Sequence, residues 1–210
     1  MLDRIRGAGS PNEAEIPAAY VSLPREYHRH GRMSAEARLA LMIDRLREYE
    51  AEVAECAADG IVEGIARVIV ASGRRVFVAP SGLRPEWLVS GCEWHIDNGL
   101  AHSEIERMDG VVTAATCAIA ESGTIVLHHT GAEGRRAISL LPDWHLCVLR
   151  ASQVVETLPE YFERCPQAPA LATFISGPSA TADIEMTRIK GVHGPRFLNV
   201  LIVHDTGISA

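Results

Sequence analysis

A segment near the carboxyl end of the chain, residues 175–195, brings together hydroxyl, carboxylate and imidazole side chains. It reads ISGPSATADIEMTRIKGVHGP, and it leaves an apolar strand to enter a predicted helix over residues 182–190. Ser179 or Thr181 is placed to cap that helix, and Gly177 lets backbone N–H groups approach a ligand. Because the amino end of a helix favours negative charge, the segment predicts a site for phosphate or carboxylate. Its predicted ligand-binding residues are Ser176, Gly177, Ser179 and Thr181.

The same segment holds two candidates for catalysis, an aspartate and a histidine. Asp183 lies in the first turn of the predicted helix, where it either offsets the helix dipole or acts as a base or nucleophile. Glu185 points about 200° away from it on a helix, so the two carboxylates do not form a dyad. His193 has glycines close on both sides, which turn geometry also explains, and it is kept as the second candidate. The spacing matches neither a GxxxxGK[ST] phosphate loop nor a dinucleotide-binding GxGxxG motif.

Two further loops carry side chains that suit an anionic ligand. In the turn at residues 121–124, Glu121 is either a base or nucleophile or an ordinary solvated turn residue. The loop at residues 131–136 is rich in glycine and presents Arg135, whose planar guanidinium suits carboxylate or phosphate. His145 opens the next strand, either as a hydrogen-bonded structural residue or as part of the site. Glu121 is thus a third catalytic candidate, and Gly123, Thr124, Arg135 and His145 are predicted to bind ligand.

The spacing of apolar residues predicts helices and strands that alternate around these loops. Predicted helices follow Ser34, run from Asp59 to Gly73, follow Pro85, and span residues 135–141, 153–163 and 182–190. Predicted strands span residues 52–56, 75–79, 110–115, 125–128, 145–149, 171–175 and 197–203, and residues 116–120 are predicted as a turn or a short helical stretch. This alternation indicates a single-domain α/β fold, a mainly parallel sheet flanked by helices. We expect ligand at the carboxyl ends of the strands.

Composition and charge limit the classes of function. The 210 residues are 47% hydrophobic and 22% charged with a net charge of −7, which favours a soluble globular protein and disfavours nucleic acid as a partner. The apolar stretches are too short for a membrane span and no signal peptide is evident, so a cytoplasmic location is expected. The five cysteines are widely spaced, and His128-His129 lack further ligands, so this chain is expected to hold no metal, iron–sulfur cluster or other cofactor.

Three motifs, taken in order, resemble the LUD-domain family and, within it, the lactate utilization protein C branch. They are AIAESGTIVL at residues 118–127, GRRAISLLPDWH at residues 134–145, and the segment at residues 175–195. The similarity covers most of residues 34–204, so residues 34–210 are expected to form the LUD α/β domain and residues 1–33 a poorly ordered N-terminal arm. Relatives tend to show an acidic or polar residue where this chain has Ala115-Thr116-Cys117. The resemblance also implies a fold similar to the NagB/RpiA/CoA-transferase-like group.

The resemblance implies a function as well as a fold. It implies a role in oxidising L-lactate to pyruvate together with partner subunits that carry the iron–sulfur clusters, with this chain binding a small anionic metabolite. Two alternatives stay open. One is a free-standing isomerase, CoA-transferase or cyclo-ligase with Glu121 or Asp183 as base or nucleophile, and the other is a binder that senses a metabolite without transforming it.

Overall fold

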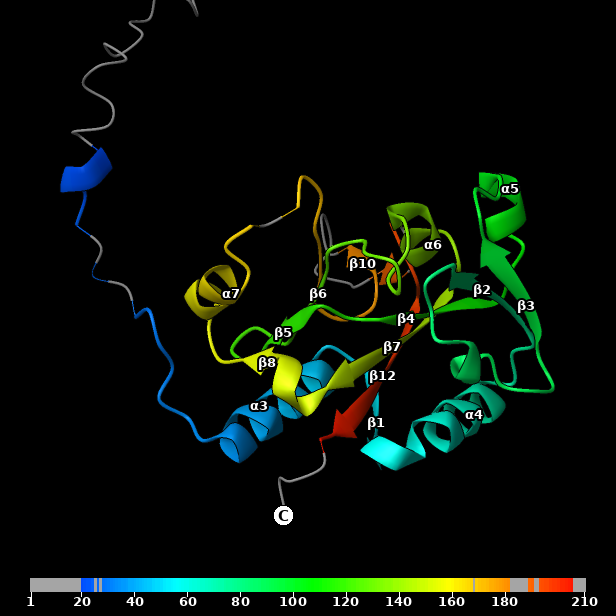
Figure 1. The fold of residues 1–210 in the computed structure, drawn as a ribbon, viewed down its shortest axis with the longest axis horizontal. Helices are drawn as coiled ribbons and strands as arrows, with labels where there is room; N and C mark the ends of the chain where they lie inside the picture. Colours follow the sequence, from blue (N-terminus) through cyan, green and yellow to red (C-terminus); the bar gives the residue numbers. More distant parts are fainter. Residues whose placement is uncertain are drawn as a thin grey trace, which may run out of the picture.

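The centre of the protein is a six-stranded sheet with helices on both faces (Figure 1). The computed structural model describes residues 20–24, 26, 28–167, 169–181, 189–190 and 193–205. In spatial order the strands are β1 (Glu52–Ala57), β12 (Phe197–His204), β7 (Trp144–Arg150), β4 (Gly110–Ala114), β2 (Val76–Pro80) and β3 (Glu93–Asp97). Each neighbouring pair is parallel. The predicted α/β fold with a mainly parallel sheet is therefore confirmed.

Helices cover the sheet where the sequence predicted them, and these are α3 (Ala35–Glu48), α4 (Ile61–Ser72) and α6 (Arg136–Leu140). Two more, α5 (His102–Ile105) and α7 (Leu158–Arg164), lie at opposite sides of the molecule (Figure 1). Neither α5 nor the edge strand β3 was predicted from the sequence. Ser34 caps α3, because its side chain accepts a hydrogen bond from the Ala37 N–H. Gly73 ends α4 at a φ of 69°, a left-handed conformation that glycine adopts without strain.

The central strand β7 is almost fully buried because both faces of the sheet are covered. Cys147 and Leu149 pack in the core with α3, whereas Leu146 and Val148 pack in the core with α4. Successive side chains of a strand point to opposite faces, so an unbroken apolar run is what a strand buried on both sides requires. The same alternation holds along β12.

A second, smaller sheet packs against the α3 face of the main one, and the sequence did not predict it. Its strands, in order, are β8 (Val154–Val155), β5 (Cys117–Ile119), β6 (Thr124–Leu127) and β9 (Thr173–Ile175). The prediction of a turn or a short helical stretch at residues 116–120 was wrong, because Cys117–Ile119 form β5. The helix predicted over residues 153–163 was also wrong in its first half, where β8 stands. Thr157 caps α7 instead, and Pro159 suits its first turn.

A pair of two-residue strands replaces part of the helix predicted over residues 182–190. Strand β10 (Ala180–Thr181) pairs antiparallel with β11 (Ile189–Lys190), so the prediction was wrong at the end of that range. Residues 182–188, with Asp183 and Glu185, lie outside the described residues. The described residues on either side form strands and not a helix, so they supply no helix dipole that would attract an anion.

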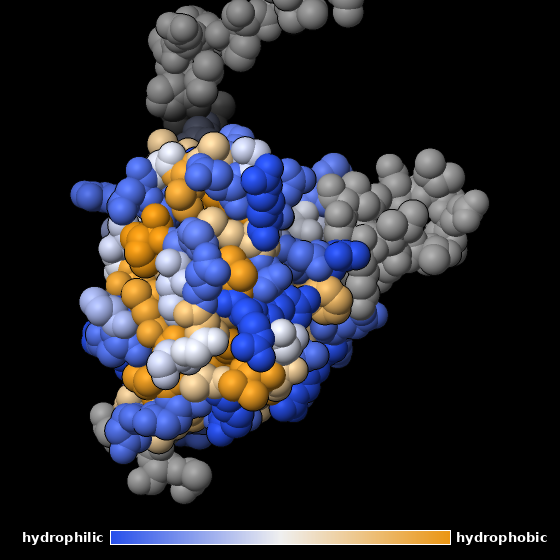
Figure 2. Space-filling model, turned by 90° about the vertical axis from the view of Figure 1, so that its right-hand side faces the viewer, coloured by the Kyte–Doolittle hydropathy of each residue, from blue (hydrophilic) through white to orange (hydrophobic). Residues whose placement is uncertain are grey.

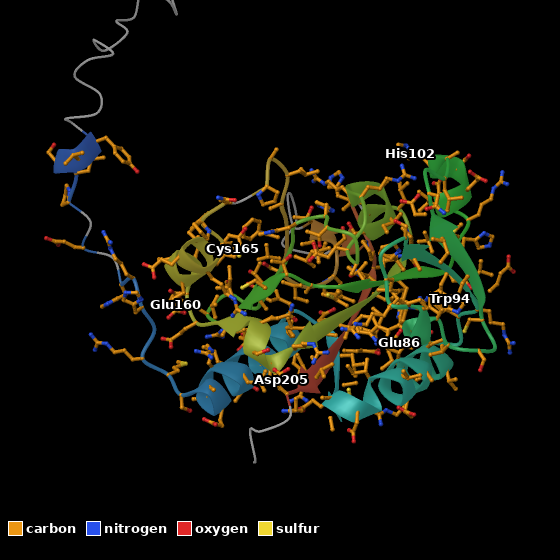
Figure 3. All side chains as sticks on the ribbon, in the orientation of Figure 1. Glu86, Trp94, His102, Glu160, Cys165 and Asp205 are labelled. Carbon is orange, nitrogen blue, oxygen red and sulfur yellow. The ribbon has the colours of Figure 1, made fainter. Side chains whose placement is uncertain are left out.

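The chain before α3 runs extended along the side of the molecule that carries α7 (Figures 1 and 3). The Gly31 N–H donates to Glu160 at 2.7 Å, and the Met33 N–H donates to Glu156 at 2.8 Å. Residues 1–19 of the predicted arm lie outside the described residues. The end of the arm closest to the domain is thus held by two carboxylates.

The outer face near α4 and β3 shows apolar side chains interspersed with polar ones (Figure 2). Val70 on α4 is 79% exposed, the largest exposed fraction among the big apolar side chains of the described residues. Within the described part of the chain, no helix is long and apolar enough to cross a membrane.

Candidate functional site

A cavity of about 320 Å³ lies beside α6 on the face of the main sheet that also carries the small sheet. We call it the α6–β9 cavity. Its described lining is Arg136, Ser139 and Leu140 of α6, residues 173–175 of β9, residues 176–180, residues 193–195, His145 and Leu198. His145 and Leu198 are the second residues of β7 and β12, so the cavity adjoins the amino ends of these strands. The sequence had predicted ligand at the carboxyl ends of the strands, which is wrong for β7 and β12. The cavity does adjoin the carboxyl end of β9.

Hydrogen bonds join the two loops that form one wall of the cavity. The Ser179 N–H donates to the Pro195 carbonyl at 2.9 Å, and the His193 N–H donates to the Ser179 hydroxyl oxygen at 3.1 Å. On the other side of the loop, the Ser176 and Thr124 hydroxyl groups are 2.7 Å apart, which ties the loop to β6. The predicted ligand-binding serines and the exposed His193 therefore reach the same cavity from distant parts of the segment.

Gly177 shapes this wall by allowing a close approach to α3. Its φ is 85°, and an added Cβ would stand 2.5 Å from the Tyr49 Cβ. Neither the backbone conformation nor the space suits any other residue, since real Cβ contacts of this length do not occur. The glycine that sequence reasoning assigned to ligand approach is thus required by packing.

Replacing Gly177 by alanine is expected to lower the free energy of unfolding by about 2–4 kcal/mol, from left-handed strain plus overpacking. Gly91→Ala is the matched control, because Gly91 has a φ of 86° and nothing within 4 Å of an added Cβ. That variant should lose only about 1–2 kcal/mol, the cost of the backbone conformation. Urea unfolding measures both, and equal losses would contradict the packing role.

Two adjacent arginines of the glycine-rich loop have different roles. Arg135 donates from Nε and Nη2 to the two carboxylate oxygens of Asp97, at 2.7 and 3.0 Å, and its guanidinium also donates to the Leu100 carbonyl. The hydrogen bond from Arg135 lowers the pKa of Asp97. Arg136 lines the cavity and, among the described residues, has no ion-pair partner. The arginine that lines the cavity is therefore the one that sequence analysis did not select.

His145 lies in the floor of the cavity as a buried, neutral imidazole. It is 1% exposed, and its Nε2 atom is 2.8 Å from the Thr113 hydroxyl oxygen. Burial lowers the pKa of His145 to about 4, because an imidazolium would lose its hydration there. His145 thus offers hydrogen bonding at neutral pH rather than positive charge.

The turn at residues 121–124 does not line the cavity. Glu121 is exposed and lines a separate hollow beside the extended segment that precedes α3. Gly123 packs against the backbone of Arg45, where an added Cβ would be 2.6 Å from the Arg45 Cβ. Thr124 is buried and reaches the site only through Ser176. Among the described residues, no carboxylate lines the cavity.

The structure thus brings together some of the predicted residues and leaves others apart. Those that line the cavity are His145, Ser176, Gly177, Ser179 and His193. Glu121, Gly123, Thr124 and Arg135 lie elsewhere, the backbone of Thr181 is in β10, and Asp183 is outside the described residues. Sequence reasoning missed Arg136 and Ser139, although both lie one turn apart on a short helix, a spacing that places them on one face.

The described lining is suited to hydrogen bonding and to an anion. It contains no cysteine, so thiol chemistry is not expected from these side chains. Cys117 and Cys147 are buried, which raises the pKa of Cys117 to about 11 and that of Cys147 to about 12. Neither forms a thiolate near neutral pH. Within the described residues, no group of three or more histidine, cysteine or acidic side chains is arranged to hold a metal ion.

Comparison with known proteins assigns the chain to a family. The model of the LUD domain matches residues 39–203. A lactate utilization protein C of Deinococcus radiodurans is 42% identical over 164 residues, which are 76% of each chain. A lactate utilization protein C of Halalkalibacterium halodurans is 36% identical over 118 residues, 53% of this chain and 51% of the relative.

A solved structure agrees with this assignment. The crystal structure of a DUF162 family protein from Deinococcus radiodurans has a TM-score of 0.72 and 34% identity, and the match covers 82% of this chain and 99% of that one. This likeness supports the parallel sheet and its flanking helices as the fold of the family. The chain therefore belongs to the LUD domain family, as the three sequence motifs had indicated.

Proposed function

We propose that this protein takes part in lactate utilization and binds a small carboxylate, L-lactate or pyruvate, in the α6–β9 cavity. The observation that carries the proposal is the pairing of Arg136 with hydroxyl and imidazole groups around one cavity. A guanidinium without an ion-pair partner among the described residues suits a carboxylate, and the serine hydroxyl groups suit its remaining oxygens. The names of the relatives supply the metabolic context.

The size and position of the cavity support a small metabolite as the ligand. Its volume of about 320 Å³ lies at the lower end of the range for ligand pockets, about 300–1,000 Å³. Its described lining also includes apolar groups, with the 46%-exposed Phe174 among them. A three-carbon acid presents a carboxylate to the arginine and a methyl group to such a surface.

Replacing Arg136 by glutamine is expected to weaken the binding of pyruvate or L-lactate at least about tenfold, the effect of losing one charge-assisted hydrogen bond. Isothermal titration calorimetry measures the affinity. The matched control is Arg84→Gln, which removes an exposed arginine that is paired with Glu86 and is not part of the described cavity lining. If the wild-type protein binds either acid and both variants bind it equally well, the proposed site is wrong.

The proposal places iron–sulfur partner subunits beside this chain. Oxidation of lactate to pyruvate removes two protons and two electrons, and the electrons need an acceptor. The described side chains around the cavity are arginine, serine, threonine, histidine and apolar groups, which do not cycle between redox states. Partner subunits with iron–sulfur clusters would accept the electrons while this chain holds the acid.

Anaerobic purification of the tagged protein from its native host tests the partnership. We expect iron and acid-labile sulfide to co-purify in a fixed ratio to this chain, and the assembly to reduce an artificial electron acceptor when L-lactate is added. An isolated chain that turns over a sugar phosphate, an acyl-CoA or a folate would instead support the free-standing enzyme. Binding of a metabolite with no turnover, alone or with partners, would support a sensor.

A further inference from the structure

His145 is held by a threonine on the neighbouring strand, and this contact bears on the proton that the imidazole carries. Thr113 lies on β4 and is fully buried, and its hydroxyl oxygen is 2.8 Å from Nε2 of His145 and 3.9 Å from Sγ of Cys147. The Cys147 thiol donates in turn to the Ala114 carbonyl. These groups form a short polar chain under the floor of the α6–β9 cavity.

The proton of the Thr113 hydroxyl group has two acceptors within reach, and they differ in strength. The imidazole nitrogen is the closer one, and its lone pair is a far better acceptor than a thiol sulfur. With Nε2 unprotonated, the hydroxyl group donates to this stronger acceptor; with Nε2 protonated, its proton would have only the thiol sulfur within reach among the described residues. A neutral imidazole carries one N–H, so with Nε2 as the acceptor the proton resides on Nδ1.

Nδ1 is not among the fully enclosed polar atoms that lack a partner in the described chain. It has no hydrogen-bond partner among the described residues. In the described chain, Arg38 Nε is the one fully enclosed side-chain nitrogen or oxygen atom without a partner, so Nδ1 of His145 cannot be fully enclosed. The open space that His145 borders is the α6–β9 cavity.

We infer that His145 is a neutral hydrogen-bond donor to an oxygen of the ligand in the α6–β9 cavity, through Nδ1–H, and that Thr113 is the positioning residue that selects this tautomer. The inference rests on the proposed ligand site and deepens it. The depressed pKa of His145 agrees with a group that stays neutral at physiological pH. Arg136 then supplies the charge, and His145 supplies a directed donor.

This arrangement defines a class of ligand. A carbonyl, hydroxyl or carboxylate oxygen accepts a hydrogen bond from Nδ1–H. An ammonium group at the same place is itself only a donor, so no hydrogen bond would form. The site thus favours 2-oxo and 2-hydroxy acids over 2-amino acids. A buried donor left without an acceptor is the physical basis of that discrimination.

Nitrogen-15 NMR of the histidine-labelled, ligand-free protein at pH 7 tests the tautomer, with the His145 signals assigned by their loss in His145→Gln. We expect the Nδ1–H form in the wild type. Thr113→Val, which keeps the shape and removes the hydroxyl group, should lose the preference for Nδ1–H, and Thr113→Ser should restore it. Far-UV circular dichroism checks that both variants fold.

Ligand binding supplies the second measurement. Pyruvate affinity should fall about fivefold in Thr113→Val, the worth of one neutral hydrogen bond, and recover in Thr113→Ser. An Nε2–H tautomer in the wild type, or a tautomer unchanged in Thr113→Val, overturns the inference. If neither acid binds to the wild type, the proposed function fails, and because the tautomer is read without ligand the two failures are distinguishable.

Discussion

Replacing Glu133 by alanine is expected to destabilise the protein by about 3–5 kcal/mol, the cost of leaving several buried donors without an acceptor. Glu133 is 2% exposed, and its carboxylate accepts hydrogen bonds from the Thr116 hydroxyl group and from the backbone N–H groups of His128 and Thr130. These contacts join the loop before α6 to Thr116, which directly precedes β5, and to His128, which directly follows β6. Urea unfolding followed by circular dichroism measures the loss.

Glu133→Gln separates the loss of hydrogen bonds from the loss of charge. The amide oxygen can still accept from both backbone N–H groups, while the amide nitrogen donates to the Thr116 hydroxyl oxygen. We therefore expect a loss of only about 1 kcal/mol, close to that of a single perturbed hydrogen bond. Glu106→Gln and Glu106→Ala, at an exposed position, should both be nearly neutral. Equal effects of Glu133→Ala and Glu106→Ala would show that the loop does not depend on this carboxylate.

Glu133→Ala should also weaken ligand binding in the α6–β9 cavity, because the loop that holds Glu133 leads directly into α6. His129 links the loop to β9 through hydrogen bonds to the Gly134 carbonyl and to the Thr173 hydroxyl group. With the Glu133 carboxylate removed, the loop that leads into α6 loses its hydrogen bonds to Thr116 and to the backbone of His128, so Arg136 is held less firmly. Weaker pyruvate binding in Glu133→Ala than in Glu133→Gln is the expected result.

Acidification is expected to cost the folded protein about 3 kcal/mol between pH 7 and pH 4 through His145 alone, as the linkage of protonation to unfolding gives. Its pKa falls from the ordinary 6.5 to about 4 in the folded state because of burial. Between these two pKa values, His145 is protonated in the unfolded chain and neutral in the folded one. The stability is complete above the unfolded pKa and is lost as the pH falls toward the folded one.

The difference between the wild type and His145→Gln isolates this contribution. The stability of the variant should depend less on pH in the window from about 6.5 to 4, which is bounded by the two histidine pKa values. The described carboxylates with lowered pKa values, which are Glu36, Asp97, Glu160 and Asp205, also contribute stability that is lost on acidification, but they are present in both proteins and cancel in the difference. Parallel curves for the two proteins would contradict the neutral imidazole.

Much of the main sheet was predictable because its elements are specified locally. The period of apolar residues, the cap at Ser34 and the stop at Gly73 are contained in short stretches of sequence, and each was found where expected. The small sheet was not predictable in this way. Its strands are short, with β8 only two residues long, and their pairing joins segments that are distant in the chain. Propensity carries little information about such strands.

By itself the sequence determined the α/β class, the family motifs and the segment that supplies one wall of the cavity. Only the tertiary structure decided which polar side chains meet there. Arg135 and Arg136 are equivalent in sequence terms, but Asp97, from a strand 38 residues away, binds the first, whereas the second lines the cavity. Likewise Thr113 gives His145 its buried partner from another strand. Such contacts depend on the sheet register, which long-range packing fixes and local sequence does not.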